Sequence, residues 1–189
     1  MKKLLLILGV VVVALAMASC AGGAEEEQGT PSAAGAPDWY LNPPVADDAI
    51  YGVGSAKMSR LDTSRKMAVS RAREDIAFQM NATIEAAIID YAQEAGVDDN
   101  NQVVNFVENI SRQVTETTLR GARTDQVAQG PDGTIYALVS YPRDGFIGAA
   151  DEAFKRNEDA AFAEFKAEQA LEYLDSQVKD NPTRAGSTQ

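Results

Sequence analysis

The sequence contains no histidine and only one cysteine, Cys20. Without histidine the chain cannot use imidazole as an acid, a base or a metal ligand, and one cysteine forms neither an intramolecular disulfide nor a Cys/His metal site. Basic residues are also scarce, with 17 Lys and Arg against 28 Asp and Glu, so the formal net charge is -11. No basic patch would follow a phosphate backbone, so we expect no nucleic-acid partner, no metal and no other cofactor.

Hydrophobic residues make up 45% of the 189 residues, which is too large a share for a wholly disordered protein. The length fits one globular domain with targeting or linker sequence attached. The order of the residues, and not their composition, has to indicate the function.

The amino-terminal residues 1–19 have the pattern of a secretory signal peptide. Lys2 and Lys3 precede an apolar run over residues 4–18, which is shorter than the ~20 residues of a membrane span. The run ends in Met17-Ala18-Ser19-Cys20, which resembles the lipobox of bacterial lipoproteins. The resemblance implies that residues 1–19 are removed and that Cys20 is acylated, with chains such as palmitate that hold the protein on a membrane. The alternative is a plain signal peptide followed by an accidental cysteine.

Residues 20–36 follow the signal as a predicted tether. The stretch after Cys20 reads AGGAEEEQGTPSAAGA and has no large apolar side chain, so it cannot offset the entropy of becoming ordered. We expect the ordered domain to begin near Pro37, where prolines and the only tryptophan, Trp39, indicate an extended segment pinned to a core.

The domain is predicted to start with a short strand and a long helix. Residues 50–54 form the strand, and its Gly52 and Gly54 would permit close approach of a helix backbone. Residues 61–95 form the helix, with Asp62 or Thr63 as its N-cap and Gly96 placed to end it. An apolar stripe spaced by three or four residues predicts its buried face: Ala68, Ala72, Ile76, Met80, Ile84, Ile88 and Tyr91.

A second helix and a β-hairpin follow. Apolar spacing predicts the helix over residues 102–115, and Gly130-Pro131-Asp132-Gly133 joins two strands over residues 119–129 and 134–141. Alternation in the last strand places four side chains on one face: Ile135, Ala137, Val139 and Tyr141.

The last helical sequence, residues 145–178, begins after Pro142 with Asp144 as a candidate cap, and its apolar stripe changes direction. Either the chain breaks near Asn157, which would cap a new helix, or the second stripe packs on the far end of helix 61–95 or on another molecule. We expect the distal half to be exposed and to bind a partner, and packing on the domain's own long helix is the alternative. The candidate partner-contact residues are Leu171, Leu174 and Val178.

The predicted order is β-α-α-β-β-α, an α+β fold in which a small antiparallel sheet packs against long helices. Four segments resemble the Lpp-twenty family of bacterial lipoproteins. They are Pro37-x-Trp39 with Asn42-Pro43-Pro44, then Tyr51-Gly52-Val53-Gly54-Ser55-Ala56, then Ala68-Val69-Ser70-Arg71-Ala72-Arg73-Glu74-Asp75-Ile76-Ala77, and the strand Thr134-Ile135-Tyr136-Ala137-Leu138-Val139.

The resemblance implies an Lpp-twenty-like domain over residues 37–151. Outside the resemblance, we expect a C-terminal helical extension over 152–180 and a disordered polar tail over 181–189. A related domain occurs in the amino-terminal part of a periplasmic flagellar assembly protein, which is a likeness of fold that transfers no function by itself. The family implies a lipoprotein of the cell envelope without established catalytic residues, so no active site is carried over.

An enzyme without histidine would depend on groups such as carboxylates. Glu74, Asp75 and Glu85 share the long helix with Arg65, Arg71 and Arg73, and ion pairing on a solvated face explains this pattern better than catalysis. We therefore predict a non-enzymatic, lipid-anchored module of the cell envelope, at the outer membrane, acting in binding, structure or assembly with an envelope or flagellar protein. The alternative is a carboxylate-dependent, peptidoglycan- or glycan-active enzyme.

Overall fold

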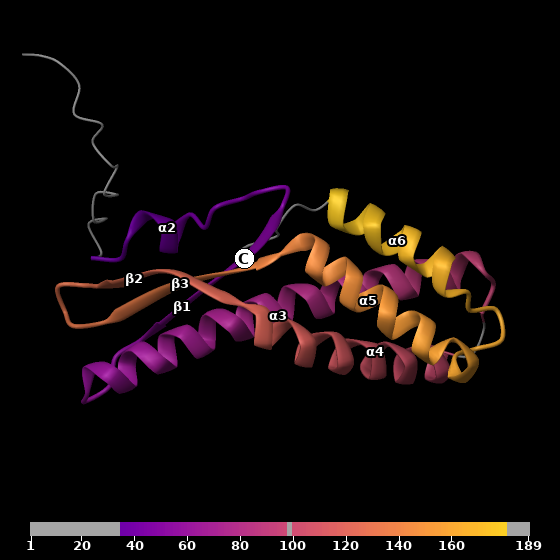
Figure 1. Cartoon of the computed structure of the whole chain (residues 1–189), viewed down its shortest axis with the longest axis horizontal. Helices are drawn as coiled ribbons and strands as arrows, with labels where there is room; N and C mark the ends of the chain where they lie inside the picture. Colours follow the sequence, from indigo (N-terminus) through magenta and orange to yellow (C-terminus); the bar gives the residue numbers. More distant parts are fainter. Residues whose placement is uncertain (1–34, 98–99, 181–189) are drawn as a thin grey trace, which may run out of the picture.

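The computed structural model describes residues 35–97 and 100–180, and it confirms the α+β class and the antiparallel sheet (Figure 1). A short helix precedes the predicted elements, and the long C-terminal helical region is divided in two. The elements in chain order are α2 (Asp38–Leu41), β1 (Ala49–Ala56), α3 (Leu61–Glu94), α4 (Asn100–Gly121), β2 (Arg123–Gln129), β3 (Ile135–Pro142), α5 (Arg143–Asn157), a 3-10 turn η2 (Glu158–Ala160) and α6 (Ala167–Asp180).

The three strands are arranged in the order β1-β3-β2, with every neighbouring pair antiparallel. The four side chains predicted on one face of β3 are all buried, and Leu138 and Ser140 on its other face are buried too, because β3 is the central strand. The hairpin between β2 and β3 is confirmed. Its first strand begins only at Arg123, since α4 continues to Gly121 through Val114 and Thr118, buried one turn apart.

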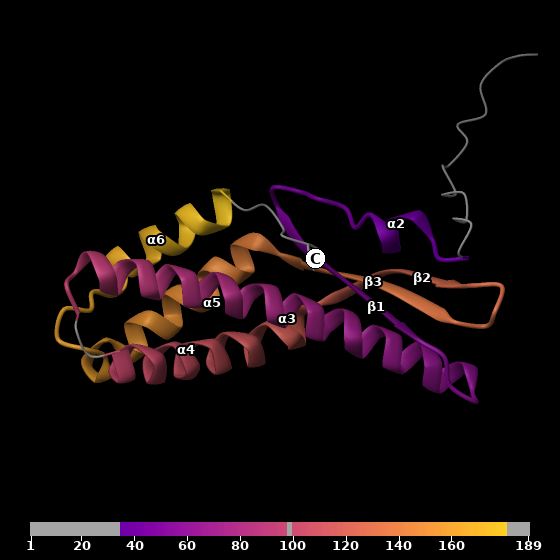
Figure 2. The ribbon, with the colours of Figure 1, turned by 180° about the vertical axis from the view of Figure 1, so that it is seen from behind.

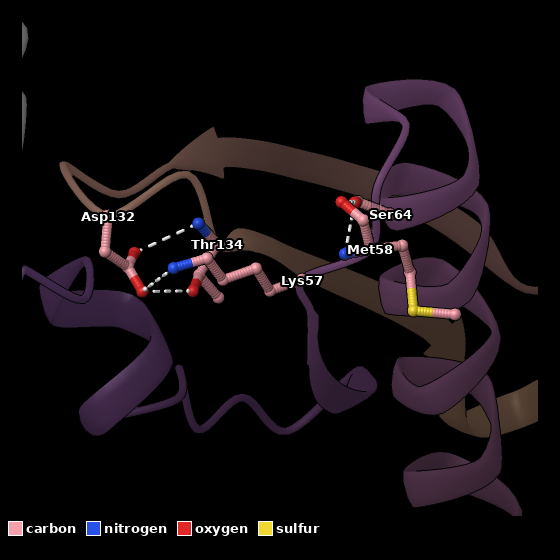
Figure 3. Close-up of polar contacts among 5 residues, drawn as sticks. All are labelled: Lys57, Met58, Ser64, Asp132 and Thr134. Carbon is pink, nitrogen blue, oxygen red and sulfur yellow. Dashed lines mark hydrogen bonds and ion pairs between the residues drawn. The ribbon is translucent and has the colours of Figure 1, made fainter.

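Helix α3 matches its predicted limits, and Gly96 follows it with a φ of 72°. The predicted N-cap is wrong, because Arg60 occupies that position and Asp62 lies in the first turn. Instead, the buried hydroxyl of Ser64 accepts the Met58 N–H (2.9 Å) and donates to Arg60 O (3.0 Å), as Figure 3 shows for the first of these bonds. An internal serine therefore organises the start of this helix.

Gly52 and Gly54 bring β1 against α3, as predicted from the sequence. A Cβ on Gly52 would lie 2.2 Å from Ala72 O, and one on Gly54 would lie 2.3 Å from Ala68 O. Real Cβ atoms do not approach backbone oxygen so closely, so neither position accepts a side chain without moving the helix or the strand.

The far half of α3 lies among α4, α5 and α6 (Figure 2). The space between them is filled by a cluster of aromatic rings, of which Phe106 and Phe165 are the closest pair, with centroids 4.5 Å apart. The other rings of this cluster are Tyr91, Phe154, Phe162 and Tyr173.

The chain breaks near Asn157, one of the alternatives left open by the sequence. Asn157 ends α5 and stands at the N-cap position of η2, but its side chain makes no cap bond there; its Nδ2 donates to Ala153 O (2.6 Å). The predicted exposure of the distal half is wrong, and its contact with a partner stays a prediction. Leu174 and Val178 are buried and Leu171 packs against the same core, because the turn after α5 returns α6 onto α3 and α5.

Both predicted ends of residues 37–151 require adjustment. The boundary at 151/152 lies inside α5, whose Ala150 and Phe154 belong to one core, so the extension shares the core of the domain. At the other end Ala36 is already buried, and Gly35 lies beside Pro131 of the hairpin. The predicted signal peptide, Cys20, the rest of the predicted tether and the predicted tail over 181–189 lie outside the described residues.

Candidate functional site

The outer edge of β1 is closed by side chains of α3. Edge strands carry unpaired backbone N–H and C=O groups, which form a template for adding another strand. Here three α3 residues spaced by four each bind one outward backbone group of β1, since residues four apart share one helix face. The three hydrogen bonds run from Arg71 Nη1 to Ser55 O (2.6 Å), from Val53 N to Asp75 Oδ2 (3.0 Å) and from Gln79 Nε2 to Tyr51 O (2.9 Å).

These contacts correct the predicted ion pairing on α3. In the described part of the chain, none of the carboxylates in that pattern forms an ion pair with its arginines: Asp75 binds the backbone of β1, Glu74 accepts the hydroxyl of Ser70, and Glu85 is exposed. Of these charged side chains, Asp75 and Arg71 therefore hold the strand against the helix.

The outer edge of β2 is open, in contrast to that of β1. The backbone groups of β1 residues 51, 53 and 55 point outward, so the residues between them pair with β3. Backbone groups alternate in direction along a strand, so those of β3 residues 136, 138 and 140 point toward β2. Their β2 partners point inward, so the backbone groups of Val127 and Gln129 point away from the sheet. No hydrogen bond to those outward groups occurs within residues 35–97 and 100–180.

A groove of about 780 Å³ lies between this strand and the amino-terminal half of α3. Arg65, Lys66 and Arg73 line it together with a single carboxylate, Asp62, so the groove carries positive charge in a chain with a net charge of -11. Leu61, 61% exposed, adds an apolar contact surface.

The hairpin tip is fixed to the connection between β1 and α3 near this groove (Figure 3). Asp132 accepts hydrogen bonds from the backbone N–H (3.0 Å) and the hydroxyl (2.7 Å) of Thr134 and from Lys57 Nζ (3.3 Å). The backbone N–H of Thr134 is the largest cause, and with the other two donors it lowers the pKa of Asp132 to about 2. Asp132 is therefore a carboxylate at neutral pH and joins the hairpin to Lys57.

A second hollow of about 240 Å³ lies among β1, α3, α5 and α6. Its walls are mostly apolar and include Ile50 and Phe146, with Phe78 as an exposed ring. Arg143 and Gln79 also line it. We call this hollow the Arg143 pocket.

Neither hollow has the residues of a metal centre, and no group of three or more Asp, Glu or Cys side chains within residues 35–97 and 100–180 could hold a metal ion. Of the predicted partner-contact residues, Val178 lines the Arg143 pocket, whereas Leu174 is wholly buried. Sequence reasoning did not single out Arg143 or the open edge of β2. The sequence does contain one indication of the Arg143 pocket: Phe78 is a large apolar residue outside the buried stripe of α3.

No model of a known protein family matches the chain, and no curated protein matches it. The resemblance to the Lpp-twenty family therefore stays a prediction from the sequence. In the part of the chain that the structure describes, no helix has the length and apolar character needed to cross a membrane.

Proposed function

We propose that this chain is a non-catalytic binding module of a bacterial cell envelope, held to the outer membrane by lipid on Cys20. Its binding surface is the open edge of β2, which takes up an extended segment of an envelope protein. The anchor follows from the basic residues, the apolar run and the lipobox-like end of residues 1–20. The binding surface follows from the contrast between the two sheet edges.

That contrast is the observation that carries the proposal. An uncovered edge strand can pair with other chains and cause aggregation, so proteins commonly cover it. In β1, side chains of Arg71, Asp75 and Gln79 do this. The same helix leaves β2 uncovered, and an extended segment can bind there through main-chain hydrogen bonds. A bulge between Thr124 and Gln126 interrupts the register, so the added strand would pair with residues 126–129.

The groove beside the edge indicates the kind of segment that binds. Arg65 and Lys66 are exposed and have no ion-pair partner among the described residues, so they favour acidic side chains next to an added strand. A partner segment that alternates apolar and acidic residues would place its acidic face on the groove.

Site-specific crosslinking in intact envelopes tests this proposal. A photoreactive residue in place of Gln129 should capture one protein. The same residue in place of Val104 should not, because Val104 is an exposed valine near the start of α4, and β2 follows the other end of that helix. Val127→Pro removes an outward N–H that no bond to β3 uses, and fixes φ at about −65°, so it should abolish the crosslink. Val127→Ala keeps the N–H and should retain most of the crosslink.

Equal crosslinking of Val127→Pro and the unaltered chain would show that main-chain pairing is not used. The anchor is tested separately with Cys20→Ala, which should abolish incorporation of labelled fatty acid. Acylation that persists in that variant would contradict the assignment of Cys20.

A further inference from the structure

The Arg143 pocket contains a partly buried cation without a partner. The guanidinium of Arg143 makes no hydrogen bond or ion pair with any residue of the described ranges, and its Nε is shielded from solvent. Arg73 is the other arginine with a shielded Nε, and its Nη2 donates to Ala122 O (3.4 Å). Withdrawing a charge from water without a partner is unfavourable, so an anion bound at Arg143 would relieve that cost.

The same pocket contains an acceptor without a donor. Gln79 uses its Nε2 to close the edge of β1 at Tyr51 O, which fixes the orientation of its amide. Its Oε1 is shielded from solvent and has no hydrogen-bond partner among the described residues. A ligand relieves both polar groups when it offers an anionic acceptor to Arg143 and a hydrogen-bond donor, such as an amide N–H, to Gln79.

The remaining walls require an apolar body of limited size. Ile50, Ala82, Phe146 and Val178 line the pocket, and Phe78 lies beside them with 73% of its surface exposed. A volume of about 240 Å³ is smaller than the ~300 Å³ at which pockets for drug-sized ligands begin. It fits one amino-acid unit with a medium-sized apolar side chain.

We propose that the Arg143 pocket binds an apolar amino-acid unit that carries a free α-carboxylate and an acylated nitrogen. The carboxylate pairs with the guanidinium of Arg143, the amide N–H donates to Gln79 Oε1 after a small shift of that side chain, and the apolar group packs between Ile50 and Phe146. An N-acylated amino acid has this chemistry, and so does the carboxyl-terminal residue of a peptide. The pocket shares no lining residue with the groove beside β2, so this inference stands independently of the proposed function.

Calorimetric titration of the full chain with three small probes tests the recognition. N-acetyl-leucine should bind with millimolar or better affinity. N-acetyl-leucinamide lacks the carboxylate and should bind at least tenfold more weakly. The compound 4-methylpentanoate keeps the carboxylate and the apolar chain but lacks the N–H, and it should also bind more weakly than N-acetyl-leucine.

Two matched variants locate the site. Arg143→Gln should abolish the preference for the acid over the amide, whereas Arg112→Gln, at an exposed arginine of α4, should leave that preference unchanged. Because the Arg143 side chain has no partner within residues 35–97 and 100–180, Arg143→Gln should melt at or above the temperature of the unaltered chain. A large drop in that temperature would mean that Arg143 has a structural role and would overturn the proposal.

A peptide that ends in leucine distinguishes the two sources of the ligand. Binding more than tenfold tighter than that of N-acetyl-leucine indicates the carboxyl terminus of a protein, and equal binding indicates a small acylated amino acid. The proposal fails if acid and amide bind equally well, if Arg143→Gln keeps the preference, or if N-acetyl-leucine produces no heat at millimolar concentration.

Discussion

The amino-terminal half of α3 lies against backbone, whereas its carboxyl-terminal half lies among aromatic rings. At the sheet end, Gly52 and Gly54 place no side chain of the strand between β1 and the helix backbone. At the helical end, rings such as Phe154 and Phe165 fill the space among four helices. One continuous helix thus uses close approach at one end and bulky side chains at the other, so the two ends should tolerate opposite kinds of substitution.

Removing a ring at the helical end should have the largest effect. Phe165 is 1% exposed and contacts Tyr91, Phe106, Phe154 and Phe162, so Phe165→Ala leaves a cavity and should lower the free energy of unfolding by about 3–5 kcal/mol. Phe78→Ala, at an exposed phenylalanine, should change it by no more than about 0.5 kcal/mol. Denaturant unfolding measures both values. Similar losses in the two variants would contradict the packing described for α6 and its preceding turn.

Adding a methyl group at the sheet end should have the next largest effect. The new Cβ of Gly54→Ala would meet Ala68 O and Ala72 N, which are backbone atoms that cannot rotate away, so the loss should be about 1–3 kcal/mol. Gly148→Ala is the matched control, because Gly148 lies in α5 with nothing within 4 Å of its added Cβ. That variant should gain about 0.5–1 kcal/mol from helix propensity. A neutral Gly54→Ala would show that α3 does not lie as close to β1 as described.

The two ends should also differ in their response to acid. Because the folded pKa of Asp132 is about 2, below its ordinary value of 3.8, its contribution to stability is present above pH 3.8 and is lost as the pH falls toward 2. Asp132→Asn should lack this part of the acid dependence, measured as the change in melting temperature between pH 5 and pH 2. Parallel curves for the variant and the unaltered chain would show that the hairpin tip is not held by this carboxylate.

Alkaline pH should act on the helical end, with the smallest effect. A hydrogen bond to Glu94 raises the pKa of Tyr173 to about 12 from its ordinary value of 10, so this contact contributes stability below pH 10 that is lost as the pH rises toward 12. Tyr173→Phe removes that contribution and should reduce the loss of melting temperature over this range. An unchanged alkaline slope would show that the hydroxyl does not link α6 to α3.

The parts of the fold that were predictable have a local cause. Gly96 follows α3 and adopts a positive φ, which glycine accepts readily, so it marks the end of the helix. Gly52 and Gly54 predict close packing because they have no side chain. The position of α6 was not predictable, because its apolar stripe is equally suited to α3 and to another molecule. Only the turn after Asn157 decides between them.

The candidate sites were harder to foresee for the same reason. Whether β1 or β2 has the open edge depends on strand order and on which side chains of α3 reach the sheet. Arg143 follows Pro142 in sequence without a motif around it, and its significance comes from the pocket that β1, α3, α5 and α6 form together. Such sites arise from tertiary contacts that no single segment encodes.

The pairing of β1 with β3 has a consequence for the order of folding. These strands lie far apart in the sequence, with α3, α4 and β2 between them, whereas β2 and β3 are joined by a short turn. Closing a long loop costs more entropy than closing a short one. We therefore expect the β2–β3 hairpin and the α3–α4 pair to form early, and β1 to pair with β3 only after α3 is in place. The strand whose edge is sealed most thoroughly is therefore the one we expect to dock last, and its amides should gain protection from hydrogen exchange after those of β2 and β3 during refolding.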